Sequence, residues 1–201
     1  IFTSGATEAN NLAILGCARG YALDAGKPGH LITLSTEHHS VLDPIRQLRK
    51  EGFRLTEIHP DSDGLLSKER LLEAFEEDTC LVSLMLANNE IGVIQPLKEL
   101  AKVCRDKGAI LHSDAAQAFG NMPFSKDDFG INLLSLSGHK VYGPKGIGLL
   151  IIDEKLPIVP LQWGGGQEQE LRPGTLPVPL VVGFAKAAEL ALKDLQIRSA
   201  R

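Results

Sequence analysis

The sequence predicts an α/β fold: a mostly parallel, doubly wound sheet flanked by helices. Short apolar, β-branched runs alternate with stretches of helical spacing, and several runs are apolar on both faces. Such runs are expected of strands that helices cover from both sides. The chain has 201 residues, 43% hydrophobic and 23% charged, which fits a single domain with one sizeable core.

Turn residues bound six apolar runs, and we therefore predict strands at 30–36, 53–59, 80–87, 109–115, 132–137 and 147–152. Residue 1 also falls inside a strand pattern that leads into a loop. Helical spacing lies between the strands, over residues 14–21, 41–48, 71–75 and 97–104. Pro96 suits the first turn of the last of these helices, and Gly52 and Gly108 stand where helices end.

Residues 178–201 are predicted to form one long amphipathic helix that leaves the domain. Its apolar stripe consists of Val181, Phe184, Ala188, Ala191, Leu192 and Leu195. The pattern starts in a strand at residue 1 and stops in mid-helix without a cap. We therefore expect residues 1–201 to be a single large domain that is truncated at both ends.

Charge and composition exclude several function classes. The formal net charge is −4 and no basic stripe is visible, so neither nucleic acid nor an anionic membrane surface is an expected partner. No apolar run reaches the roughly 20 residues of a membrane span. The three cysteines, Cys17, Cys80 and Cys104, have no metal-ligand spacing and are too scattered for a disulfide framework. We expect a reducing compartment, the cytoplasm, or an organelle if a leader preceded residue 1.

Polar residues follow the predicted strands, at the sheet edge where doubly wound folds bind ligands. They lie in segments 4–11, 36–40, 88–92, 113–117 and 137–140. In the first segment, small residues lead directly into a helix, so free backbone N–H groups and the Thr7 hydroxyl predict an anion site. The alternative, equally weighted, is that Thr7 only caps the helix.

Asp114 and Lys140 are the most specific candidates for residues of a ligand-binding or catalytic site. A carboxylate buried at the end of a strand needs a cation, either a lysine or arginine or a protonated ring nitrogen of a cofactor. Lys140 follows a strand whereas Lys145 lies in a Gly-Pro turn, so Lys140 is the better candidate for a buried, neutral, nucleophilic amine. The alternative is a solvated surface lysine.

The histidines divide into two groups. His38 or His39, at the end of a predicted strand, is placed to lie over a planar ring and carry protons. The histidines within or beside strands, His30, His59 and His112, are interpreted as structural, and the cysteines as core residues.

Taken together, six segments resemble the cysteine desulfurases, pyridoxal-phosphate enzymes of fold type I in the class V aminotransferase family. The resemblance covers almost the whole chain in the family's order. The segments are FTSGATEANNLAILG, TEHHSVLDP, LANNEIGVIQP, HSDAAQAFG, SLSGHKVYGPKGIG and GGGQEQELRPGTLPVPLVVG. The family usually has serine where this chain has Pro173, a departure that leaves Thr175 in place.

The resemblance implies that Lys140 carries pyridoxal 5'-phosphate as a Schiff base and that Asp114 pairs with the pyridinium nitrogen. It further implies that Gln117 contacts the ring hydroxyl, that Asn89 orients cofactor and substrate, and that His38 stacks on the ring and shuttles protons. The implied phosphate ligands are Ala6, Thr7, Ser137, His139 and, from a partner subunit, Thr175. A homodimer is therefore implied.

The family reaction takes sulfur from L-cysteine, releases L-alanine and leaves a persulfide on an enzyme cysteine. A sulfur-acceptor or scaffold protein then receives the sulfur, for iron–sulfur cluster assembly or another sulfur-transfer pathway. None of the three cysteines matches the nucleophile, whose loop lies downstream of residue 201 in the family, so we expect this chain itself to be inactive. The alternatives are a selenocysteine lyase, a non-catalytic cofactor-binding or partner-binding fragment, and an α/β domain for another phosphate ligand.

Overall fold

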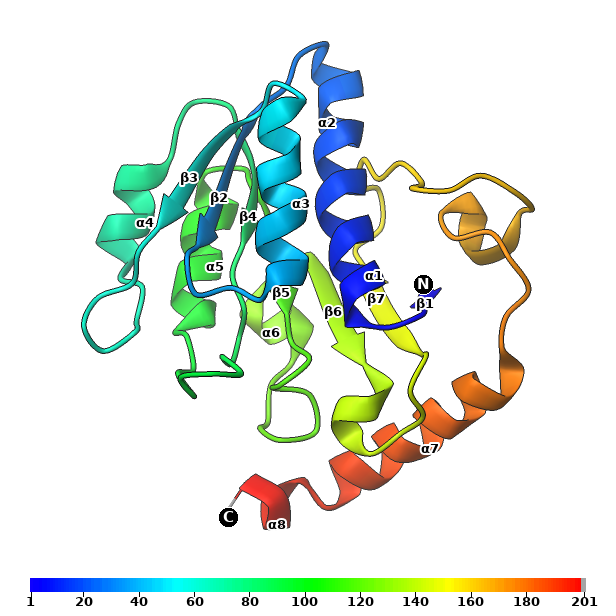
Figure 1. Ribbon diagram of the computed structural model, residues 1–201. Coiled ribbons are helices and arrows are strands. Elements are labelled where there is room, and N and C mark those ends of the chain that lie inside the picture. The colour runs from blue at the N-terminus through cyan, green and yellow to red at the C-terminus, as the bar shows by residue number, and fades with distance from the viewer. Residues whose placement is uncertain (200–201) are drawn as a thin grey trace.

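The computed structural model describes residues 1–199 as a seven-stranded sheet with helices on both faces (Figure 1). The strand order is β1-β7-β6-β5-β4-β2-β3; β7 pairs antiparallel with both β1 and β6, and the other strand pairs among these residues are parallel. The strands are β1 Phe2–Thr3, β2 His30–Leu34, β3 Arg54–Ile58, β4 Thr79–Ser83, β5 Ile110–Asp114, β6 Leu133–Ser137 and β7 Gly148–Ile152.

Helices occupy the predicted stretches between these strands. They are α1 Ala6–Asn11, α2 Cys17–Ala25, α3 His39–Lys50, α4 Lys68–Ala74, α5 Leu97–Asp106, α6 Lys126–Phe129, α7 Val178–Lys193 and α8 Leu195–Ser199. A π-helical turn, Leu12–Gly16, joins α1 to α2, and two 3-10 turns cover Gly138–Val141 and Gln167–Glu170. All six predicted strands and the doubly wound arrangement are confirmed.

Neighbouring residues of one strand belong to different cores, which is why the strands are apolar on both faces. Leu31 of β2 packs in a core with Val41 and Ile45 of α3, while Ile32 packs in a second core with Leu97 and other residues of α5. Figure 1 shows α1, α2 and α3 on one face of the sheet and α4 and α5 on the other. Helices therefore cover both faces of the sheet, and the edge formed by the carboxyl ends of the strands remains accessible to a ligand.

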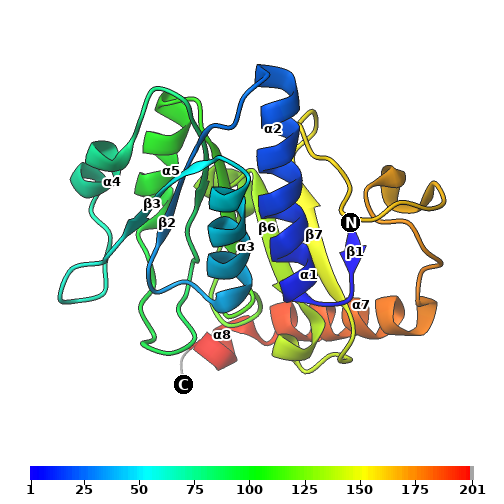
Figure 2. The same cartoon turned by 45° about the horizontal axis from the view of Figure 1, so that its top comes forward.

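The prediction of one continuous helix over 178–201 is wrong. Helix α7 ends before Asp194, whose φ of −95° and ψ of 10° are not helical, and α8 follows from Leu195. Phe184 and Ala191 of the predicted stripe are buried, but Leu192 is 54% exposed. Helix α7 lies across the end of the sheet in Figure 2 rather than leaving the domain, because Phe184 packs edge-on against Phe119. The last two positions of the predicted helix, 200–201, lie outside the described residues.

No helix among residues 1–199 is both long and apolar enough to cross a membrane.

The π-helical turn and helix α2, which follows it, approach the backbone of a loop closely. Gly16 and Gly20 face this loop: the Val159 N–H donates to the Gly16 carbonyl at 3.1 Å, and a Cβ on Gly20 would lie 1.8 Å from the Pro157 carbonyl oxygen. Small residues on this helix face are therefore required for the loop to pack.

Gly20→Ala is expected to destabilise the chain. Alanine favours a helix interior over glycine by about 1 kcal/mol, but forcing a methyl group onto a backbone carbonyl costs about 1–3 kcal/mol or more. Because a Cβ 1.8 Å from a carbonyl oxygen is a severe overlap, the upper end of this cost applies, and we expect the free energy of unfolding, measured by urea denaturation, to fall by about 2 kcal/mol. Gly166→Ala is the control, because its added Cβ meets no atom within 4 Å. A Gly20→Ala variant as stable as the control would contradict the close packing.

Candidate active site

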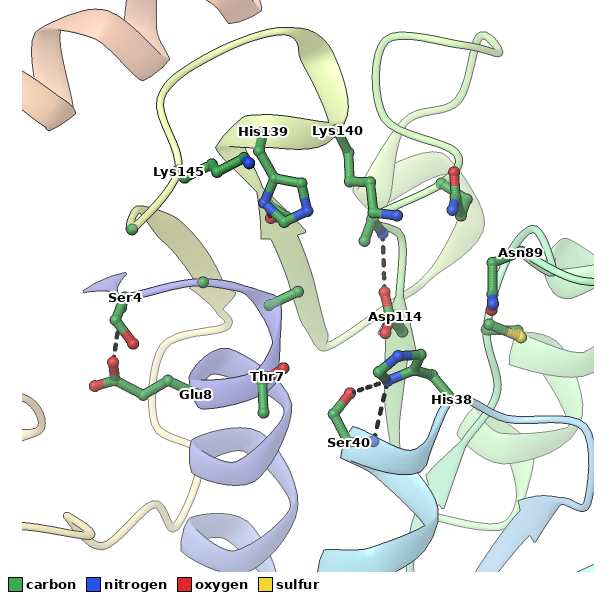
Figure 3. A pocket seen from close by; sticks show the side chains of 17 residues that line it. Ser4, Thr7, Glu8, His38, Ser40, Asn89, Asp114, His139, Lys140 and Lys145 are labelled. Atoms are coloured by element: carbon green, nitrogen blue, oxygen red, sulfur yellow. Dashed lines mark hydrogen bonds between the residues drawn. The ribbon is translucent and has the colours of Figure 1, made fainter.

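A cavity of about 630 Å³ opens at the carboxyl ends of the parallel strands (Figure 3). Its volume is typical of small-molecule sites. Nine of the ten predicted site residues line it: Ala6, Thr7, His38, Asn89, Asp114, Gln117, Ser137, His139 and Lys140. The prediction did not single out the other lining residues, Ser4, Gly5, Glu8, Ser40, Met85, Ala116, Lys145 and Gly146. One sheet edge thus gathers residues from across the chain.

The loop before α1 leaves backbone N–H groups at the cavity. Helix α1 begins after Gly5 without a side-chain cap, so the alternative that Thr7 only caps the helix is wrong. Glu8 joins the loop before α1 to a distant loop: its carboxylate accepts from the Ser4 N–H at 2.7 Å and from Arg172 Nε at 2.9 Å. The uncapped first turn and the Thr7 hydroxyl together form a wall suited to an anion.

Asp114 is a buried carboxylate without a cationic partner. It is 6% exposed, and its two oxygens accept from the Ala116 N–H at 2.9 Å and from Asn10 Nδ2 at 2.7 Å. Burial raises the pKa of Asp114, and these two hydrogen bonds, together with the charges of His38 and Lys140, lower it in part. Among residues 1–199, no lysine, arginine or histidine nitrogen lies within 4.0 Å of its oxygens. The predicted alternative of a protein salt bridge is therefore wrong.

Lys140 lies on the rim of the cavity rather than buried within it. It belongs to the 3-10 turn Gly138–Val141 after β6, and both it and His139 are exposed. The prediction of a buried Lys140 is wrong because this turn borders an open cavity. Figure 3 shows the Lys140 side chain directed into the cavity on the side of Asp114, while Lys145 reaches toward His139. Lys140 therefore faces the site, as expected, although protein atoms do not enclose it.

The structure decides between the two adjacent histidines. His38 lines the cavity and caps the N-terminus of α3, and its Nδ1 accepts from the Ser40 N–H at 3.0 Å and lies 2.8 Å from Ser40 Oγ. His39 points away, with 81% of its side chain exposed, and pairs with Asp43. His38 is therefore the site histidine. Its ring is held by α3 at a helix N-terminus, a position that the sequence alone did not reveal.

The histidines interpreted as structural do not line the cavity. His30 and His112 are fully buried and bridge hydroxyl groups of neighbouring strands. In β5, His112 lies between Ser83 and Ser135 at 2.8 and 2.9 Å, and burial lowers its pKa to about 3. His112 is thus neutral and supports the sheet two residues before Asp114. His59 is exposed on the surface.

Comparison with known proteins places the chain in a family. All of it, residues 1–201, matches the family described as aminotransferase class-V. The chain belongs to the class-V aminotransferase family. Cysteine desulfurase IscS of Rickettsia massiliae (strain Mtu5) is 50% identical over 198 residues, which are 98% of this chain and 48% of that relative.

Two solved structures share the fold. DndA from Streptomyces lividans superposes with a TM-score of 0.89 at 46% identity, covering 98% of this chain and 56% of that one. SspA in complex with cysteine also gives a TM-score of 0.89, at 45% identity, covering 94% of this chain and 54% of that one. The predicted family and fold are therefore confirmed. This class-V chain spans about half the length of the curated relatives it matches.

The cysteines of this class-V aminotransferase chain are core residues, as predicted. Cys17, Cys80 and Cys104 are all buried and free, and burial raises the pKa of each thiol to about 12. None of them lines the cavity. A thiol that stays protonated and has no access to the cavity is a poor nucleophile there.

Thr175 is the one predicted site residue that does not line the cavity. It is exposed and follows a loop tied to α1 through Arg172 and Glu8. Within this loop, Gln162 Nε2 donates to the Pro173 carbonyl and the Gly174 N–H donates to Gln167 Oε1. The resemblance assigned Thr175 to the site of a partner subunit, and that role stays a prediction.

Glu37, which precedes His38, is a buried carboxyl that the prediction did not single out. Its Oε1 accepts from the Met85 N–H at 2.7 Å, whereas its Oε2 has no hydrogen-bond partner within the part of the chain that the structure describes. Burial raises the pKa of Glu37 well above its ordinary value, although the Met85 hydrogen bond opposes this. The residue ties the end of β2 to the end of β4 and so fixes the loop that carries His38.

Glu37→Gln is expected to stabilise the chain increasingly as the pH rises. A raised folded-state pKa means that the folded wild type holds its proton more tightly than the unfolded chain does. Wild-type stability is then lost as the pH rises from the ordinary carboxyl pKa through the folded one, by up to about 1.4 kcal/mol per pH unit. Glutamine retains the acceptor for Met85 and does not titrate. Urea denaturation at several pH values measures the difference.

The exposed Glu90→Gln variant serves as the control for this measurement. A difference between Glu37→Gln and wild type that stays constant with pH would contradict the role of burial.

Proposed function

We propose that this chain is the pyridoxal-phosphate-binding domain of a cysteine desulfurase that converts L-cysteine to L-alanine and passes the sulfur on as a persulfide. The observation that carries the proposal is the buried Asp114 carboxylate, which has no cationic partner among residues 1–199 and borders a cavity that also contains an amine and an uncapped helix start. Homology to cysteine desulfurases and the likeness to SspA, solved with cysteine, support it.

The residues present fit the cofactor. Asp114 would pair with the ring nitrogen, Gln117 would contact the ring hydroxyl, and His38 would lie against the ring face. The phosphate would be held by Ala6, Thr7, Ser137, His139 and, from a second subunit of a homodimer, Thr175. When bound, pyridoxal phosphate supplies an electron sink for the carbanion of an amino-acid substrate.

The chain's own residues would then bind, orient and move protons. Lys140 would attach the cofactor covalently and afterwards hold a proton at Nζ, beside the substrate carbon. Asn89 would orient the substrate from the loop after β4. The Nδ1 atom of His38 accepts hydrogen bonds from Ser40, which leaves Nε2 to exchange a proton in the cavity.

We further propose that this chain does not complete the reaction by itself. The persulfide needs a cysteine thiolate at the substrate, and all three thiols of the chain are buried away from the cavity. Three free cysteines also fit a reducing compartment such as the cytoplasm. A sulfur-acceptor or scaffold protein would be the partner of the complete enzyme.

Binding of pyridoxal phosphate by the 201-residue chain tests the proposal. The purified chain should turn yellow after incubation with the cofactor and gel filtration, and it should bind pyridoxal, which lacks the phosphate, at least about tenfold more weakly. A colourless chain that retains no cofactor would overturn the proposal. Release of L-alanine from L-cysteine by the loaded chain would overturn only the claim that the chain is inactive alone.

A further inference from the structure

Asn10 of α1 is a fully buried amide that binds two site residues. Its Nδ2 donates to Asp114 Oδ2 at 2.7 Å and to Ser40 Oγ at 2.8 Å. Its own Oδ1 is buried and has no hydrogen-bond partner among residues 1–199. An unsatisfied buried carbonyl costs about 1–3 kcal/mol, whereas the amide nitrogen of the same side chain satisfies two buried acceptors, Asp114 Oδ2 and Ser40 Oγ. What this side chain contributes is therefore its bonds to these two site residues.

The hydrogen bonds from Asp114 through Asn10 and Ser40 to His38 form one continuous series, in which each donor and acceptor can be assigned. An ionised carboxylate only accepts, so the amide nitrogen of Asn10 must face Asp114. Ser40 Oγ accepts from Asn10, and its own proton is then free for His38 Nδ1 at 2.8 Å. The Ser40 N–H donates to the same Nδ1. His38 therefore carries its proton on Nε2.

We propose that Asn10 is a positioning residue that holds the Asp114 carboxylate toward the cavity and joins it, through Ser40, to His38. The Ala116 N–H holds Asp114 Oδ1 while Asn10 holds Oδ2, so both oxygens are fixed before a ligand arrives. Asn10 does not line the cavity and acts only through Asp114 and Ser40. Its role toward the cofactor depends on the proposed function, but its hold on Asp114 does not.

Electrostatics in the apo chain agree with this geometry. The Asn10 hydrogen bond lowers the pKa of Asp114 against the effect of burial. The charged groups that act on Asp114 are His38 and Lys140, which lower its pKa. Asp114 in turn raises the pKa of the neighbouring Glu37 carboxyl. Removing the Asn10 amide leaves those groups in place and takes away one donor from Asp114.

The test compares Asn10→Leu with Asn11→Leu, the adjacent asparagine of the same helix. Asn11 donates to a backbone carbonyl of its own helix and does not touch Asp114. We expect Asn10→Leu to lower the free energy of unfolding, because the buried Asp114 carboxylate and Ser40 lose a donor, although the orphaned carbonyl is removed as well. We expect its dissociation constant for pyridoxal phosphate to rise about tenfold, by loss of the hydrogen bond to a charged group.

Two further measurements distinguish a specific effect of Asn10 on the Asp114 carboxylate from a general disturbance of the fold. In the apo chain, carboxyl ¹³C NMR should show the Asp114 titration midpoint shifted to higher pH in Asn10→Leu and unchanged in Asn11→Leu. In an Asp114→Asn background, Asn10→Leu should change cofactor affinity much less, because only the route through Ser40 to His38 remains. An unshifted Asp114 midpoint would overturn the proposal, even if the wild type binds no cofactor. Equal losses of affinity in both backgrounds would overturn it as well.

Discussion

Lys140→Ala is expected to abolish covalent attachment of pyridoxal phosphate. Borohydride reduction of the wild-type chain loaded with cofactor should leave a stable adduct, and peptide mapping should place it on Lys140, whose side chain is directed into the cavity. Alanine has no amine with which to form the bond. We therefore expect the adduct, measured by intact mass, to fall to the background of unreduced samples.

Lys145→Ala is the matched comparison, because Lys145 lines the same cavity and is also exposed. Its adduct should remain on Lys140. Attachment that survives in Lys140→Ala, or that disappears in Lys145→Ala, would show that the wrong lysine has been assigned.

Asp114→Asn is expected to weaken binding of pyridoxal phosphate about tenfold to a hundredfold. Asparagine preserves the shape of the side chain but lacks the negative charge that a protonated ring nitrogen needs, and hydrogen bonds to charged groups contribute about 1.5–3 kcal/mol. The apo variant should be at least as stable as the wild type, since it no longer buries a carboxylate without a cation. Fluorescence titration with the cofactor measures the affinity.

The control for this change is Asp43→Asn, on the exposed side of α3, where the carboxylate faces His39 and solvent. It should bind the cofactor as the wild type does. If Asp114→Asn also binds with wild-type affinity, the buried carboxylate has no role in holding the ring, and the proposed function loses its main support.

Much of the site could be predicted because its residues follow strands. Strands that run in the same direction end at one edge of a sheet, so the polar segments after β1, β2, β4, β5 and β6 had to meet wherever the fold formed. The family resemblance then selected residues within those segments, and nine of ten line the cavity. Thr175 differs because its segment follows no strand and lies outside the cavity.

The sequence by itself determined the α/β alternation, the six main strands and the edge at which the site lies, because periodicity and turn residues report the average burial of each element. Only the tertiary structure decided how side chains meet across elements. It placed His38 in the cavity and His39 in solvent, exposed Lys140 on an open rim, and bound Asp114 to Asn10, 104 residues earlier. Such contacts join segments far apart in the chain, and no local pattern encodes them.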